Sequence, residues 1–367
     1  MLWRLSLLGV GPAAVTKPDE NIEENFIETV PYLFGNRFII GEAQDLFAIL
    51  SWTNTFEGYH MTVSIYRISA VALVLFAAGC SKSGLDEAPT QPQAEAKTPQ
   101  EEPKQPHVVF VTGDCEYRSE VSMPMIAEIL EAKHELRCSV AYAVDDTSGE
   151  RDPKYRSNIE GLEALKTADL AVFFIRFRTL PQDQFELIME YVNSGKPFIG
   201  LRTSTHSFQY PQEHELAKWN DEFGKKLFGQ RWITHHGHES RTDVAVVPEQ
   251  SSHPILRGVG PTFPCGSWLY HVAPLIGDCE PLLIGTSVDS NKTNELDKYP
   301  LKQPVAWTKT YDGSRVFFTT LGHPQDFEHE SMRRLLINGI YWCLGRDVPQ
   351  EGANADIEGE YVAPPTT

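Results

Sequence analysis

Two histidines and one glutamate stand where side chains of these types could exchange protons with a bound ligand. They lie in Gly200-Leu-Arg-Thr-Ser-Thr-His206, Leu321-Gly-His323 and Gly113-Asp-Cys-Glu116. Imidazole titrates near neutral pH, and a nearby carboxyl group can act as a second base, so His206, His323 and Glu116 are candidate catalytic residues. Two alternatives stay open: His206 fixes a loop through a hydrogen bond, or Glu116 stabilises a helix N-terminus.

Other polar and aromatic residues of the same segments are candidates for binding the ligand. Arg202 and Arg176 could hold hydroxyl or carboxylate groups through their planar guanidinium groups, or each could pair with a buried carboxylate. Tyr270 could stack on a sugar face, although aromatic residues are more often part of the core. Asp326 could either orient the His323 imidazole or cap the last helix.

The sequence contains one metal-like pattern, His235-His236-Gly-His238. Adjacent residues of an extended segment point to opposite sides, so His236 and His238, or one of them with His206 or His323, would have to share an ion such as zinc. We predict instead that His236 faces a ligand cleft without a metal. No cofactor is predicted, and zinc remains the alternative.

The candidate residues follow segments that have the character of buried strands. Continuous apolar strands that alternate with amphipathic helices predict an α/β fold with a mostly parallel central sheet covered on both faces. Ligands bind beyond the carboxyl ends of such strands, so the site is expected in the loops after Gly113, Ile175 and Leu201. The predicted strands are 107–113, 136–144, 170–177, 197–201, 244–247, 282–288, 305–308 and 315–320, and the predicted helices are 124–133, 182–193 and about 327–344.

Four segments together resemble the ThuA-like family, which is named for trehalose utilisation. They are Gly200-Leu-Arg-Thr-Ser-Thr-His206, His253-Pro-Ile-Leu-Arg-Gly258, Pro304-Val-Ala-Trp307 and Val316-Phe-Phe-Thr-Thr-Leu-Gly-His323. The resemblance covers about 107–346 and implies a flavodoxin-like three-layer α/β/α sandwich, similar to class I glutamine amidotransferases. Those enzymes carry a nucleophilic cysteine on the turn where this chain has Arg202, so glutaminase chemistry is not expected. The segment also lacks the Gly-x-Ser-x-Gly spacing of a serine hydrolase.

The chain before the folded domain resembles an export signal. Arg67 precedes an apolar run that is too short to span a bilayer and ends in Ala77-Ala-Gly-Cys80, which is similar to a bacterial lipobox. We interpret Cys80 as the lipid-modified mature N-terminus, and Ser81 favours the outer membrane, facing the periplasm, within the bacterial cell envelope. The alternative is a small N-terminal domain with a buried helix at 68–79. The predicted parts are a spurious upstream extension (1–60), a signal peptide (61–79), the lipidated Cys and a disordered tether (80–106), a ThuA-like domain (107–348) and a flexible tail (349–367).

Length and composition narrow the possible functions. A chain of 367 residues allows one large or two modest domains, and its net charge of −18 disfavours nucleic acid as a partner. We expect an exported enzyme that acts on a sugar, of the trehalose or keto-disaccharide class, by acid and base chemistry. The alternatives are a non-catalytic sugar-binding lipoprotein, which Arg202 in the nucleophile position supports, and an envelope scaffold. The expected partners are a small sugar and, through Cys80, the membrane; the oligomeric state is not predicted.

Overall fold

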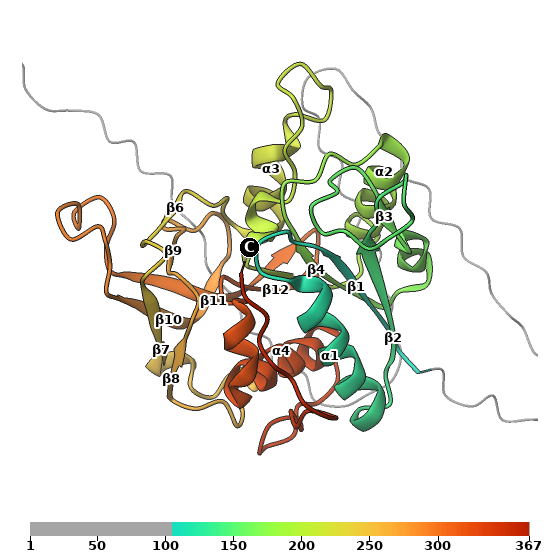
Figure 1. Ribbon diagram of the computed structural model, residues 1–367. Coiled ribbons are helices and arrows are strands. Elements are labelled where there is room, and N and C mark those ends of the chain that lie inside the picture. Colours follow the sequence, from blue (N-terminus) through green and yellow to red (C-terminus); the bar gives the residue numbers. More distant parts are fainter. Residues whose placement is uncertain (1–104, 367) are drawn as a thin grey trace, which may run out of the picture. The chain divides into compact units, whose positions relative to one another are not determined.

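Ten strands pair into one sheet in the order β3-β2-β1-β4-β5-β12-β11-β10-β7-β8 (Figure 1). The computed structural model describes residues 105–366. The five neighbours from β2 to β12 run parallel, and antiparallel strands extend the sheet at both sides. The strands are β1 (His107–Gly113), β2 (Arg137–Ala143), β3 (Ile159–Glu160), β4 (Leu170–Ile175), β5 (Phe198–Leu201), β7 (Arg241–Val246), β8 (Thr262–Cys265), β10 (Glu280–Val288), β11 (Lys302–Tyr311) and β12 (Ser314–Thr319), and β6 (Thr234–His235) pairs separately with β9 (Tyr270–His271).

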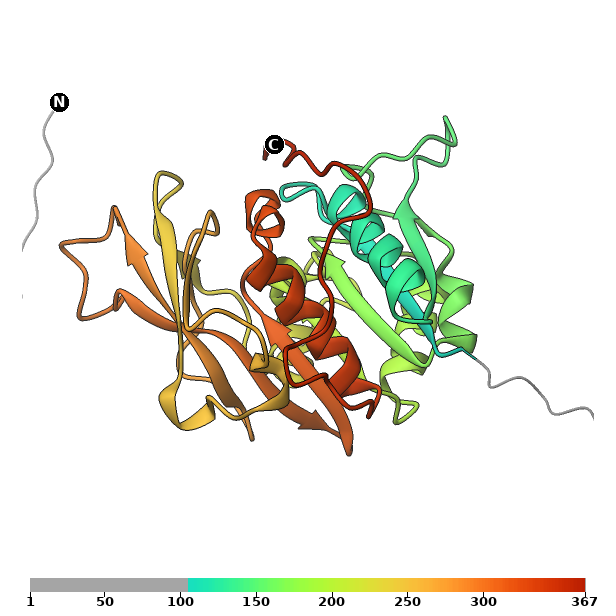
Figure 2. The same cartoon turned by 90° about the horizontal axis from the view of Figure 1, so that it is seen from below.

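Helices cover both faces of the parallel part of the sheet, as Figure 2 shows for the face of α1 (Ser119–Lys133) and α4 (Glu330–Cys343). The opposite face carries α2 (Gln182–Val192) and α3 (Trp219–Phe228). Successive residues of β1 alternate between the two cores: Val108 and Phe110 pack with α1 and α4, whereas Val109 and Val111 pack with α2 and α3. The protein therefore has the predicted flavodoxin-like α/β fold with a mostly parallel sheet centre.

The helices differ from the prediction in three places. Helix α1 begins at Ser119, before the predicted start at residue 124, and the extended backbone of His329 divides the last helix into the 3-10 turn Pro324–Glu328 and α4. Helix α3 was not predicted from the sequence, and Gly224 inside it lowers helix propensity. A Cβ atom on Gly224 would lie 2.2 Å from the Thr205 carbonyl oxygen, so glycine lets α3 approach the turn after β5.

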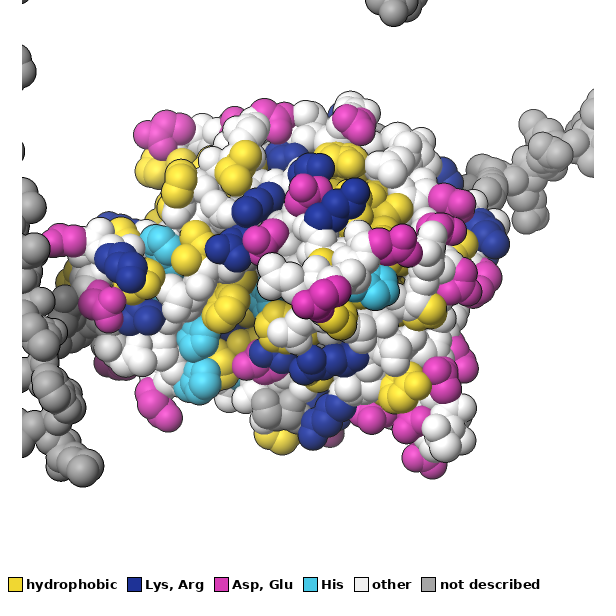
Figure 3. Space-filling model, turned by 90° about the horizontal axis from the view of Figure 1, so that it is seen from above, with side chains coloured by type: hydrophobic (Ala, Val, Ile, Leu, Met, Phe, Trp, Pro, Cys, Tyr) yellow, Lys and Arg dark blue, Asp and Glu magenta, His cyan; other side chains and the backbone are white. Residues whose placement is uncertain are grey.

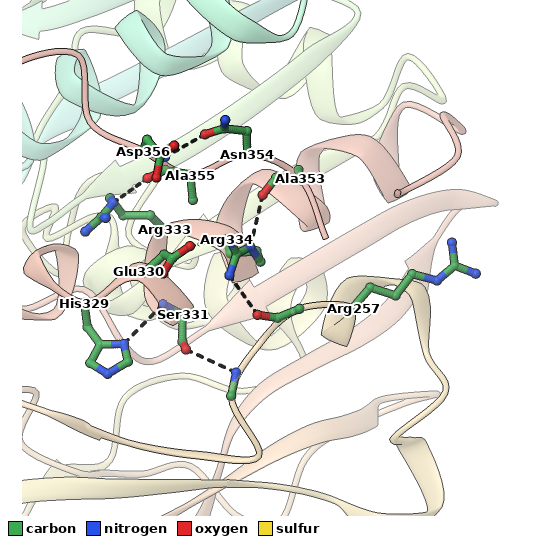
Figure 4. A network of polar contacts seen from close by, with 12 residues as sticks. Arg257, His329, Glu330, Ser331, Arg333, Arg334, Ala353, Asn354, Ala355 and Asp356 are labelled. Atoms are coloured by element: carbon green, nitrogen blue, oxygen red, sulfur yellow. Dashed lines mark hydrogen bonds and ion pairs between the residues drawn. The ribbon is translucent and has the colours of Figure 1, made fainter. Parts of the chain in front are cut away.

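The C-terminal segment packs on the domain, and the prediction of a flexible tail is wrong for it. Ala353 and Ala355 are fully buried. The Arg333 Nε atom donates to the Ala355 carbonyl oxygen at 2.8 Å, and the Arg334 Nε atom donates to that of Ala353 at 3.1 Å (Figure 4). On the other side, the His134 imidazole of the α1 C-cap bonds to the Asn354 carbonyl oxygen at 2.8 Å. The segment is thus bonded both to the C-terminal end of α1 and to α4.

Within residues 105–366, no helix is long and apolar enough to cross a membrane.

Candidate functional site

The chain turns sharply where four neighbouring parallel strands end. Gly113, Phe177, Arg202 and Gly322, in the segments after β1, β4, β5 and β12, have φ angles of 147°, 49°, 42° and 143°. Strained turns of this kind at one sheet edge are typical of functional sites. Because the four strands are parallel neighbours, the segments that follow them lie at one edge of the sheet. Figure 3 shows histidine side chains gathered with hydrophobic ones on the surface, beside Lys and Arg side chains.

The Arg202 side chain joins these segments from below the surface. It is fully buried, and its Nη1 atom donates to the carbonyl oxygens of Thr320 at 2.8 Å and Trp268 at 3.4 Å. Its Nη2 atom donates to the Tyr117 hydroxyl at 3.0 Å. The guanidinium carbon lies 4.0 Å from the ring centroid of Tyr117 and 4.4 Å from that of Tyr270, which is also buried. Arg202 thus holds the site together, and only its Nε atom has no protein partner in the described chain.

His206 lies at the end of the turn after β5 with its ring among aromatic side chains. Its ring centroid is 5.0 Å from that of Phe177 and 5.2 Å from that of Trp232, and the residue is 8% exposed. The Thr205 hydroxyl donates to the Arg202 carbonyl oxygen at 3.1 Å, so its lone pair is left to accept from His206 Nδ1, also at 3.1 Å. The neutral His206 ring is therefore protonated at Nδ1, and its Nε2 atom is a base.

Glu116 and Arg176 form an ion pair at the rim of the site. The Arg176 Nη2 atom is 3.0 Å from Glu116 Oε2, and both side chains are about a fifth exposed, at 22% and 19%. The Arg176 guanidinium also lies 4.4 Å from the Phe177 ring centroid. Glu116 does not cap α1, because within the described residues no side chain bonds to the N-terminus of that helix as a cap. The Asp114 carboxylate accepts from the backbone N–H groups of Glu116 and Tyr117 at 2.6 and 2.8 Å. The carboxylate of Glu116 is therefore available to a ligand.

His323 has the opposite tautomer to His206, and Asp326 supports its backbone. The Nδ1 atom of His323 accepts from the Gln325 backbone N–H at 3.3 Å, so the neutral ring carries its proton on Nε2. The buried Asp326 carboxylate accepts from the backbone N–H groups of Gly322 and His323 at 2.9 and 3.0 Å and from the Ser267 hydroxyl at 2.5 Å. The prediction that Asp326 binds the ligand is wrong, because its oxygens are engaged by the turn.

His236 points away from the site, which corrects a second prediction. It is fully buried. Its Nδ1 atom lies 2.7 Å from the Ser290 hydroxyl and its Nε2 atom 3.2 Å from the Pro300 carbonyl oxygen. Both ring nitrogens are thus bonded to the segment that contains Ser290 and Pro300, and neither is left for a ligand.

The other two histidines of that segment face the site together. The rings of His235 and His238 stack with their centroids 5.0 Å apart, and His238 lies 4.2 Å from the Trp268 ring centroid. Gly237 has a φ angle of 50°, which turns the chain so that His238 returns to the side of His235. The prediction that His236 and His238 would share a side was wrong, because the segment is not continuously extended at Gly237. Among residues 105–366, no three His, Cys, Asp or Glu side chains are placed to hold a metal ion.

Several buried nitrogen atoms at the site have no hydrogen-bond partner. In the described chain eight buried side-chain nitrogen or oxygen atoms lack one, and four of them are Arg176 Nε, Arg202 Nε, Trp232 Nε1 and His235 Nδ1. The first three can only donate. Leaving such groups unpaired costs about 1–3 kcal/mol each, so a ligand rich in acceptor oxygens would be favoured here. Trp232 was missed by the sequence analysis because it follows no predicted strand.

Burial lowers the pKa of His206, His235 and His323. Desolvation, with the charges of Arg176 and Arg202 added, holds the pKa of His206 well below its usual 6.5. Desolvation also lowers the pKa of His235 to about 4 and that of His323, where the Asp326 carboxylate opposes it. The imidazoles are therefore neutral at pH 7. Burial raises the pKa of Glu116 against the opposing effect of Arg176.

These shifts predict a loss of stability in acid. A histidine with a lower pKa in the folded state stabilises the fold fully above pH 6.5, and this contribution is lost as the pH falls toward the folded value, which is about 4 for His235. The free energy of unfolding, measured in urea, should therefore fall between pH 6.5 and 4, and less steeply in His235→Gln than in the wild type. His214→Gln, at an exposed loop position, is the control. Equal slopes in His235→Gln and the wild type would contradict the prediction.

The Thr205 hydroxyl should set the tautomer of His206. Thr205→Val removes the acceptor for Nδ1–H, so the neutral ring is expected to shift toward protonation at Nε2, whereas Thr205→Ser should keep the wild-type form. Ring nitrogen chemical shifts of labelled histidine report the tautomer directly. Turnover of a substrate should fall by about 10- to 100-fold in the valine variant, as when an orienting partner is lost. An unchanged tautomer in Thr205→Val would reject this role.

Comparison with known proteins places the chain in a family. Two solved structures of thua-like proteins are similar to it. The structure from Bacteroides uniformis has 17% sequence identity and a TM-score of 0.46, and the match covers 68% of this chain and 96% of that one. The structure from Parabacteroides merdae has 16% sequence identity and a TM-score of 0.47, and the match covers 69% of this chain and 96% of that one. No curated protein matches the chain. The ThuA family model, described as trehalose utilisation, matches residues 100–343. Because that match spans more than half of the sequence, the chain belongs to the ThuA family.

Proposed function

We propose that this chain acts on a carbohydrate of the trehalose or keto-disaccharide class by acid and base chemistry at the site around Arg202. One observation carries the proposal: unpartnered buried nitrogens converge with two imidazoles of opposite tautomer on a set of aromatic rings. Sugars present many acceptor oxygens and flat apolar faces, which such a lining suits. The family name supports the same substrate class.

The tautomers assign different roles to the two histidines. In a disaccharide oxidised to a ketone, the carbonyl group acidifies the adjacent C–H bond. His206 Nε2 takes that proton, the C–H electron pair forms a C=C bond to the carbonyl carbon, and the π pair of the carbonyl moves onto its oxygen, to which Arg176 donates a hydrogen bond. The carbonyl then re-forms, the C=C pair shifts to the bond with the carbon that carries the glycosidic oxygen, and the C–O pair leaves with that oxygen. His206 returns the proton to the leaving oxygen while His323 Nε2–H stabilises it, and Glu116 accepts from a sugar hydroxyl.

Exchange of the hydrogen beside the carbonyl and cleavage of the glycosidic bond can be measured separately. The wild type is incubated in deuterium oxide with glucose, trehalose and a keto-disaccharide, and mass spectrometry follows deuterium uptake beside the carbonyl and release of a monosaccharide. We expect both with the keto-disaccharide. If neither deuterium uptake nor consumption of any sugar is seen, the enzymatic proposal is rejected.

A non-catalytic sugar-binding protein is the second candidate. Its support is Arg202, whose positive φ angle and burial place a bonded guanidinium at the turn where amidotransferases have a nucleophile. Calorimetric binding of a sugar without exchange or cleavage would favour this function.

Export is a further part of the proposal. Cys80 and the segments 1–60, 61–79 and 80–104 lie outside the described residues, so the support is the sequence pattern alone. We propose a lipid anchor at Cys80 in the outer membrane, with the folded domain in the periplasm. Mass spectrometry of the native N-terminus should find a lipidated peptide that begins at Cys80. Recovery of an unmodified peptide from residues 1–60 would reject it.

A further inference from the structure

A cavity of about 510 Å³ opens beside the candidate site. Trp268 and His323, which belong to the site, form one side of it, and His238 and Gln325 add to the lining. Residues 363–366 of the C-terminal segment complete the lining together with Ser240, Arg241 and Gly266. A volume of this size suits a small organic ligand. Among the residues to which the proposed reaction gives a role, His323 lines this cavity.

The C-terminal segment reaches this place because it runs back along the helices. Figures 1 and 2 show it beside α4, ending near the turn between β1 and α1. The Tyr361 hydroxyl donates to the Pro324 carbonyl oxygen at 3.0 Å, and the Ala363 N–H donates to Glu328 Oε1 at 3.2 Å. These bonds attach the segment to the 3-10 turn that follows His323. A stretch distant in sequence therefore forms a wall of the cavity.

The lining has the groups that a sugar ring requires. Trp268 and His238 line the cavity with two rings that pack on each other, at an angle of 31° between their planes. The neutral His323 ring carries a donor at Nε2, and Gln325 offers an amide. A Cβ atom on Gly266 would lie 2.8 Å from Gln325 Oε1, so the glycine leaves room for that side chain. Arg241 also lines the cavity, but it is paired with Asp289 at 2.8 Å. Aromatic rings with a few donors and acceptors suit a hydroxyl-rich ring.

We propose that the cavity is the subsite for the second sugar ring of a disaccharide, and that residues 363–366 close its far end. The inference rests on the proposed function and adds a limit on the substrate: the site accepts short saccharides and rejects longer ones. His323 then contacts the oxygen between the two rings, which agrees with its role in stabilising the leaving oxygen.

Calorimetry on the full chain with glucose, trehalose and a trisaccharide that extends trehalose by one glucose tests this subsite. Gln325→Phe fills the cavity from an exposed position, so it should weaken trehalose binding by about tenfold while glucose binding changes by less than about threefold. Gln350→Phe, also at an exposed position but outside the cavity lining, should behave like the wild type. Urea unfolding of each variant confirms that it is folded.

Removing the wall is the complementary experiment. A chain that ends at Tyr361 should bind the trisaccharide about tenfold more tightly than the wild type does, with glucose binding unchanged. If Gln325→Phe and the shortened chain both keep the wild-type order of affinities, the subsite is rejected while the proposed function stands. If the wild type binds none of the three sugars, both the proposed function and the subsite are rejected.

Discussion

Replacing His206 with glutamine is expected to lower the turnover of a keto-disaccharide by about 10²- to 10⁴-fold, the range over which general bases contribute to catalysis. Glutamine has a similar size and can still bond to Thr205, but it offers no basic nitrogen. Because burial holds the pKa of His206 well below 6.5, the ring is neutral from neutral pH down into the acid range. The wild-type rate should therefore be flat above pH 6.5 and fall only at lower pH, as the ring becomes protonated.

The matched control is His236→Gln. His236 is also a buried histidine, but both of its nitrogens bond to Ser290 and Pro300 and it has no part in the site. This variant should lose stability and keep its turnover. Steady-state kinetics measures the turnover of both variants, and urea unfolding measures their stability. A His206→Gln protein that keeps more than about half of the wild-type rate would remove His206 from the mechanism.

Replacing Arg202 with alanine should lower the free energy of unfolding by about 3–5 kcal/mol, the range for breaking a buried charged interaction. The change leaves the buried carbonyl oxygen of Thr320 without its donor and removes the guanidinium between the rings of Tyr117 and Tyr270. Sugar binding should be lost as well, because the segments after β1, β5 and β12 are no longer joined. Urea unfolding and calorimetry measure the two effects.

Arg346→Ala is the control for this prediction. Arg346 also lies over a tyrosine ring, 4.7 Å from the centroid of Tyr341, and donates to one carbonyl oxygen, that of His134 at 2.9 Å, but it is only partly buried. Its loss should cost about 1 kcal/mol. Arg202→Lys keeps the charge without the planar fork and should fall between alanine and the wild type. Equal costs for Arg202→Ala and Arg346→Ala would show that Arg202 does not hold the site together.

The parallel half of the fold was predictable because its signal is local. Strands buried on both faces appear as continuous apolar runs, and β1 and β4 lie close to the predicted 107–113 and 170–177. The loops after such strands must meet at one sheet edge, so the site segments were found as well. Helix α3 was not predictable. Its Gly224 disfavours a helix locally and is required by the close approach of the Thr205 carbonyl oxygen, which only the tertiary structure shows.

The sequence by itself determined the family, the parallel strands at the centre of the sheet and the segments that supply His206, His323 and Glu116. The spacing of apolar residues and the ends of strands can be recognised from neighbouring residues alone. Only the tertiary structure decided what each polar atom contacts. It assigned opposite tautomers to the two histidines, bonded His236 to Ser290 and Pro300 away from the site, and returned His238 to the side of His235 through the conformation of Gly237. It also carried residues 363–366 to the rim of the site, because bonds between distant segments depend on how the layers pack.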